Sequence, residues 1–147
     1  MLSYGQNQYR KTQIATVDRG RLIVLLYEGA ISFLIKAKAS LQDNDIPGYS
    51  GQINRAQDII DELNASLNLD QGGDIARNLR RLYLFMGDQL VRAKIKQDMQ
   101  RIDEVIRMLS SLGEAWREAI AKPEAQEVLN RQPAMDAPAQ TTRGVRI

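Results

Sequence analysis

The chain has 147 residues, a formal net charge of +2, few aromatic residues, and neither cysteine nor histidine. This length is typical of one domain with its own hydrophobic core. The missing side chains exclude disulfides, thiolate nucleophiles, histidine-based triads and the usual transition-metal sites, so we predict no catalytic residue, no metal and no cofactor.

The first 17 residues, "MLSYGQNQYRKTQIATV", contain isolated apolar residues without a stable period. We therefore predict that residues 1–17 form a flexible N-terminal arm outside the core. They contain no apolar run typical of a secretory signal, and no stretch of the chain has the length and apolarity of a bilayer span. These features predict a cytoplasmic protein that does not insert into membranes.

The first predicted helix covers residues 19–43, with Asp18 as its N-cap. Two neighbouring apolar rows run along it, so we expect other helices to contact it from two sides. One row consists of Leu22, Leu26, Gly29, Phe33, Ala37 and Leu41, and the other of Ile23, Tyr27, Ala30 and Leu34.

A second helix is predicted after "DNDIPGYS", where Asp45 is a candidate N-cap and Pro47 suits the first turn. Its apolar positions alternate at intervals of three and four, as expected for an amphipathic helix packed in a bundle. They are Ile46, Tyr49, Ile53, Ala56, Ile60, Leu63 and Leu67.

Gly72 and Gly73 follow this helix and are the only adjacent glycines in the chain. A phosphate-binding loop would need further glycines, a lysine followed by serine or threonine, and a preceding strand. Asp74 comes next instead, and its carboxylate suits the positive end of a new helix. We predict that this pair forms a tight corner between two helices, with positive φ available to glycine.

Two further amphipathic helices are predicted, and Asp98 opens the second of them. Its end is set by Lys122 and Pro123. The expected core row of the third helix is Ile75, Leu79, Leu82, Met86, Leu90 (or Gln89) and Ala93. That of the fourth is Met99, Ile102, Ile106, Leu109, Gly113, Trp116 and Ile120.

The predicted fold class is all-α, an antiparallel up-down four-helix bundle, because short loops make consecutive helices antiparallel. The bundle should cover residues 18–121. Residues 122–147 hold three of the four prolines and no sustained period. We predict that this C-terminal tail is disordered.

The charged residues favour solvation or pairing over chemistry. Acidic residues of the second helix, among them Asp58 and Glu62, lie beside or opposite its apolar row rather than in a pocket. The basic run of Arg77, Arg80 and Arg81 lacks interleaved aromatic residues for base stacking. We therefore expect charge matching between the second and third helices and no nucleic-acid partner, with RNA binding as the weaker alternative.

An apolar strip on the third helix does not fit a simple bundle. Leu84, Val91 and Ile95 lie largely opposite the core row, with Gly87 as a notch between them. Such a strip is typical of a surface that binds a partner helix. A wider core or a homodimer contact is the alternative. Further candidates at the edges of their core rows are Ile59, Val105 and Met108.

The sequence resembles the flagellar export chaperones of the FliS type over residues 7–121. The resemblance depends on "NQY" near the N-terminus, "LIVLLYEGAISFL", "AQDIIDELNASLNLDQGGDIARNLRRLYLFM" and "IDEVIRMLSSLGEAW". The order and spacing of the Gly-Gly-acid-Ile corner and the following Asn-Leu and Leu-Tyr pairs are specific. Family positions that look structural match Leu26, Tyr27, Gly29, Leu79 and Leu82.

This resemblance implies a non-enzymatic cytoplasmic chaperone for flagellin. Such a chaperone binds the disordered C-terminal segment of flagellin, prevents premature polymerisation, and delivers the subunit to the cytoplasmic domain of the flagellar type III export gate. It also implies that Tyr9 lies in a mobile arm on the flagellin-binding surface and contributes to the export-gate contact.

Two departures from the family pattern limit what is carried over. Asp18 and Arg19 stand where the family commonly has a Ser-Pro pair, and the chain after Pro123 matches nothing in the family pattern. The rival hypothesis is a generic helical adaptor or homodimerisation module that uses the same apolar strips on itself. A homodimer of the free chaperone is also compatible with the sequence.

Overall fold

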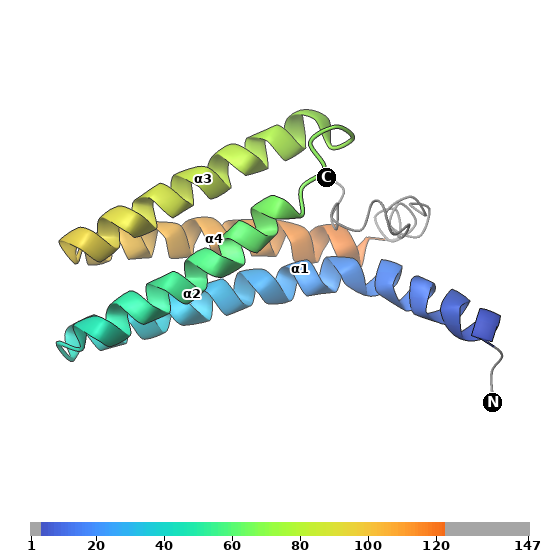
Figure 1. The fold of residues 1–147 in the computed structure, drawn as a ribbon. Coiled ribbons are helices and arrows are strands. Elements are labelled where there is room, and N and C mark those ends of the chain that lie inside the picture. The colour runs from blue at the N-terminus through green and yellow to red at the C-terminus, as the bar shows by residue number, and fades with distance from the viewer. Residues whose placement is uncertain (1–3, 123–147) are drawn as a thin grey trace.

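Four helices make up the part of the chain that the computed structural model describes, which is residues 4–122, with side chains from residue 19 onward. They are α1 (Tyr4–Gln42), α2 (Ile46–Ala65), α3 (Gly73–Lys96) and α4 (Met99–Ala121). Each runs opposite to the helix before it (Figure 1). Packing joins α1 to α2, α2 to α3, α3 to α4, and α4 back to α1. The predicted antiparallel up-down bundle is confirmed.

The core lies between all four helices and consists mainly of aliphatic side chains. Each large apolar side chain that is fully buried contributes about 1.5–3 kcal/mol to folding. The largest fully buried side chains are Tyr27, Leu34, Tyr49, Ile53, Ile60, Leu63, Met86, Leu90, Ile102, Val105 and Leu109.

The start of α1 differs from the prediction. The helix begins at Tyr4, so Asp18 lies inside it and is not an N-cap. The segment between them contains no proline, and its polar and β-branched residues each cost only tenths of a kcal/mol of helix propensity. Nothing therefore ends the helix there. The side chains of residues 4–18, that of Tyr9 among them, and the whole of residues 123–147 lie outside what the structure describes. The mobility of the arm and the disorder of the tail therefore stay predictions.

The core side of α1 centres on the second of its two predicted rows. Tyr27, Ala30 and Leu34 are fully buried, whereas Leu22 from the other row is exposed. Of the remaining residues of that first row, Ala37 is fully buried and Leu26, Phe33 and Leu41 are partly buried against the core, while Gly29 faces α2. There, a Cβ added to Gly29 would lie 3.3 Å from Cδ1 of Ile59, which shows how closely the two helices approach.

Capping side chains fix the starts of α2 and α4 as predicted. Oδ1 of Asp45 accepts a hydrogen bond from the backbone N–H of Gly48 at 3.0 Å, and Pro47 lies in the first turn. Asp98 accepts from the backbone N–H of Gln100, also at 3.0 Å. Each cap satisfies a backbone donor that the helix leaves unpaired.

The glycine pair forms the predicted corner between α2 and α3, but its two members differ. Gly73 has φ +59°, whereas Gly72 has φ −79° and ψ −11°, which any residue adopts. Asn68 holds the turn, because its side-chain oxygen accepts from the N–H of Gln71 at 3.0 Å and its carbonyl accepts from the N–H of Gly72 at 2.7 Å. Asp74 occupies the first turn of α3.

Gly73→Ala is expected to lower the free energy of unfolding by about 1 kcal/mol, because an L-residue is strained at positive φ. A Cβ at this position would meet no atom within 4 Å, so the cost is conformational and not steric. Gly72→Ala is the matched control and should be neutral or slightly stabilising, because alanine adopts the conformation of Gly72 and restricts the unfolded chain. Urea denaturation of both variants measures the difference, and equal stabilities would contradict the assignment of positive φ to Gly73 alone.

Candidate partner-binding surface

The α3 strip is defined as Leu84, Gly87, Val91 and Ile95, and its three apolar side chains are exposed as predicted. Val91 is 42% exposed and Ile95 is 73% exposed, and Leu84 is also exposed. The buried row of the same helix begins at Ala76 and Leu79 and continues through Tyr83, Met86, Leu90 and Ala93. At 100° per residue, the two rows occupy different sides of α3, so the strip cannot enter the core.

The strip borders α2 at its Gly87 notch. The backbone carbonyl of Gly87 accepts a hydrogen bond from Nε2 of Gln57 on α2 at 3.4 Å. In the last turn of α3, Nζ of Lys94 donates to Oδ1 of Asn54 at 2.7 Å. A Cβ at Gly87 would meet nothing within 4 Å, so the surface above this residue is open.

The other three candidates do not join this strip. Ile59 is half-buried against Gly29 of α1, on the side of α2 that faces away from α3. Val105 is 0% exposed and belongs to the core, so its assignment as a partner-binding residue is wrong. Met108 is half-buried and packs on the edge of the core.

A second apolar edge lies between α3 and α4, and of its residues the sequence pattern predicted only Met108. Leu82 and Phe85 are exposed. Gln89 of α3 contacts Arg101 of α4. Because the two helices are antiparallel, the residue seven positions before Gln89, which is Leu82, lies opposite the residue seven positions after Arg101, which is Met108. The core assignment of Leu82 was wrong because Tyr83, one residue later, takes the inward position.

Ile75 was also wrongly assigned to the core, since it is exposed and Ala76 is buried in its place. The run "LYLFM" around Leu82 is apolar at almost every position. A run of this kind contains more apolar residues than one core-facing stripe can bury, and that surplus was the available signal for Phe85.

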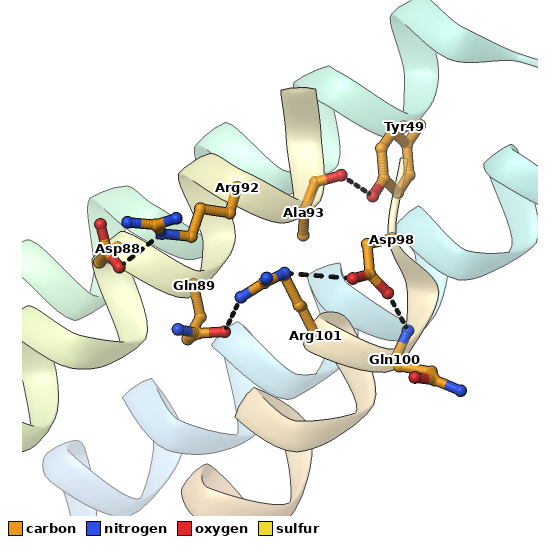
Figure 2. A network of polar contacts seen from close by, with 8 residues as sticks. All are labelled: Tyr49, Asp88, Gln89, Arg92, Ala93, Asp98, Gln100 and Arg101. Carbon is orange, nitrogen blue, oxygen red and sulfur yellow. Dashed lines mark hydrogen bonds and ion pairs between the residues drawn. The ribbon is translucent and has the colours of Figure 1, made fainter. Parts of the chain in front are cut away.

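A polar network joins the end of α3 to the start of α4 (Figure 2). Nη1 of Arg101 donates to Oε1 of the buried Gln89 at 2.7 Å, and its Nε donates to Oδ2 of Asp98 at 3.1 Å. Tyr49 of α2 donates its hydroxyl to the carbonyl of Ala93 at 2.6 Å. Burial and the negative charge of Asp98 raise the pKa of Tyr49, so this hydroxyl stays protonated as a donor. The network fixes α3 against both of its neighbours.

A second polar contact lies in the core between α1 and α3. The hydroxyl oxygens of Tyr27 and Tyr83 are 2.5 Å apart and buried. Burial raises the pKa of both tyrosines, and the neighbouring Tyr27 raises that of Tyr83 further. Both hydroxyls are neutral near pH 7, so the pair is a satisfied hydrogen bond across the bundle and not an acid–base group.

Two ion pairs between helices of the described region join α1 to α4. Lys38 pairs with Asp103 at 2.5 Å, and Arg117 pairs with Glu28 at 3.2 Å. Within the described residues, the structure has no ion pair that corresponds to the charge matching expected between the second and third helices. Arg77 pairs with Asp74 of its own helix instead.

Among the helices of the described region, none combines the length and the apolarity needed to cross a bilayer. An all-α bundle with exposed apolar surfaces on one rigid helix is typical of proteins that act by binding other proteins. The fold and the surface therefore define a helical module with a candidate surface for a protein partner.

The comparisons with known proteins place this module in a family. The chain belongs to the family described as flagellar protein FliS, whose model matches residues 2–123. It is 38% identical to the flagellar secretion chaperone FliS of Salmonella typhimurium over 118 residues, covering 80% of this chain and 87% of that protein. The relative of the same name from Vibrio cholerae is 37% identical over 105 residues, covering 71% and 77%.

A third relative, the flagellar secretion chaperone FliSB of Pseudomonas aeruginosa, is 33% identical over 106 residues, covering 72% of this chain and 84% of its own length. These relatives are named as chaperones, which is a non-enzymatic role. The prediction of a FliS-type chaperone that is not an enzyme is confirmed.

Proposed function

We propose that this chaperone binds the disordered C-terminal segment of flagellin in the cytoplasm, prevents its premature polymerisation, and delivers it to the flagellar type III export gate. The observation that supports this most directly is the exposed α3 strip on a helix that is otherwise fixed in a bundle. A disordered segment that gains helix on binding needs such a surface, because apolar burial must offset about 2–5 kcal/mol of ordering cost.

Calorimetric titration with a peptide of the flagellin C-terminal segment tests this proposal, with helicity followed by circular dichroism. Tight one-to-one binding with a gain of helix is expected. Absence of binding would overturn the proposal and leave the family membership and the bundle standing.

Self-association is the second candidate function, and the edge formed by Leu82, Phe85 and Met108 favours it because two exposed apolar residues of α3 and the half-buried Met108 of α4 lie together there. A homodimerisation module would bury this edge against a second copy. Light scattering of the free protein separates the two functions, since an obligate module should be a stable dimer without flagellin.

Tyr9 carries the proposed export-gate contact. Tyr9→Ala is expected to weaken binding of the flagellin-loaded chaperone to the cytoplasmic domain of the gate by about tenfold, because a tyrosine at the centre of an interface commonly contributes 1–2 kcal/mol or more. Pull-down and calorimetry with the purified gate domain measure this. Unchanged gate affinity would remove Tyr9 from the contact, and Tyr4→Ala in the same helix is the matched control.

A further inference from the structure

Three exposed arginines lie at the beginning of α3, namely Arg77, Arg80 and Arg81. Two of them continue the α3 strip toward the start of the helix. Positions 77, 80, 84, 87, 91 and 95 follow one another at intervals of three, four, three, four and four, which keeps them on one side of the helix. This side of α3 is therefore basic in its first half and apolar in its second half.

The positive charge of this cluster is not neutralised by α2. Arg77 pairs with Asp74, and Nη2 of Arg81 donates to Oδ1 of Asn78 at 2.6 Å, both within α3. In the part of the chain that the structure describes, no ion pair links α2 to α3, although α2 carries exposed acidic residues such as Asp58. The N-terminal end of α3 adds a partial positive charge at the same place.

We propose that the α3 strip takes a partner helix that runs antiparallel to α3, with the C-terminal end of that helix over Arg77, Arg80 and Arg81. This inference rests on the proposed function and adds a direction to it. The last turn of a helix carries unpaired carbonyl groups and a partial negative charge. A C-terminal segment of a protein also ends in a carboxylate, the group that arginine binds with two parallel hydrogen bonds.

The opposite direction is disfavoured by the same charges. A partner helix parallel to α3 would place its own positive N-terminal end against the arginines. Its apolar residues could still contact Val91 and Ile95, because the hydrophobic effect has no direction. The arginine cluster, rather than the apolar strip, therefore decides the direction in which the partner binds.

A double-mutant cycle tests this direction. Two peptides of the flagellin C-terminal segment are compared by calorimetry, one with a free C-terminal carboxylate and one with a C-terminal amide. Each is titrated into the wild-type protein and into Arg80→Gln/Arg81→Gln. In the wild type, amidation is expected to weaken binding about two- to fivefold, the range of a solvent-exposed ion pair. In the double variant, amidation should have little effect, because Arg77, the arginine that remains in the cluster, is already paired with Asp74.

Arg107→Gln is the control, since it removes an exposed guanidinium from α4 and leaves α3 unchanged. Arg107→Gln should retain the full effect of amidation. Raising the salt concentration should reduce that effect in both the wild type and Arg107→Gln. An equal effect of amidation in the wild type and in Arg80→Gln/Arg81→Gln would overturn the proposed direction. Absence of binding of the free acid to the wild type would instead overturn the proposed function itself.

Discussion

Val91→Asp is expected to leave the bundle folded and to weaken binding of the flagellin C-terminal segment by roughly tenfold to a hundredfold. Val91 is 42% exposed and lies in the middle of the α3 strip, so an aspartate there remains solvated in the free protein. The complex of the variant would lack the free energy gained by burying the valine side chain. It would also bury a carboxylate that has no hydrogen-bonding or charged partner. Each 1.4 kcal/mol lost is a tenfold change in affinity.

Calorimetry with the flagellin peptide measures this loss, and circular dichroism reports the helical content of the variant. Ile35→Asp is the matched control, because Ile35 is also exposed but lies on α1, diagonally across the bundle from α3. It should bind as the wild type does. Wild-type affinity of Val91→Asp would remove the α3 strip from the interface, whereas collapse of its helical content would show that Val91 is a core residue.

Val105→Asp is expected to unfold the bundle at ambient temperature. Like Val91→Asp, this substitution replaces a valine with an aspartate, but the side chain of Val105 is 0% exposed and lies among core residues of all four helices. Burying an unpaired carboxylate costs several kcal/mol, against a total stability of about 5–15 kcal/mol for a domain of this size.

Thermal and urea denaturation followed by circular dichroism measure this effect. Val105→Ala is the control and should remain folded, with a loss of about 1–3 kcal/mol from the missing methyl groups. A folded Val105→Asp with the melting temperature of the wild type would mean that this face of α4 meets solvent, and Val105 would again be a candidate for partner binding.

Helical periodicity predicts which residues share one side of a helix, but the contrast between Val91 and Val105 shows that it does not predict which residues at the edge of a row are buried. On α4, Ile102 and Leu109 belong to the core row whichever way the row is drawn, but Val105 and Ile106 lie on either side of it. The predicted row included Ile106, and the structure buries Val105 completely and Ile106 only partly. A row of residues defines a stripe on a helix, but the position of the neighbouring helices decides how wide the stripe is and where its centre lies.

The same ambiguity explains the misplacement of Leu82. Leu82 and Tyr83 are both apolar and are separated by 100° around α3, so either could face the core. Tyr83 faces inward because its hydroxyl meets that of Tyr27 from α1, a residue 56 positions away in the chain. Sequence spacing within one helix contains no information about such a contact.

The sequence by itself determined the features that depend on neighbouring residues: the four helices, the caps at Asp45 and Asp98, the corner at Gly73, and the surplus of apolar residues on α3. These follow from backbone conformation, local hydrogen bonds and a period of 3.6 residues. Only the tertiary structure decided which helices share ion pairs, which apolar residues remain exposed, and where Arg101 and Gln89 meet. These features arise from the packing of segments distant in the chain, whose relative rotation no local pattern fixes.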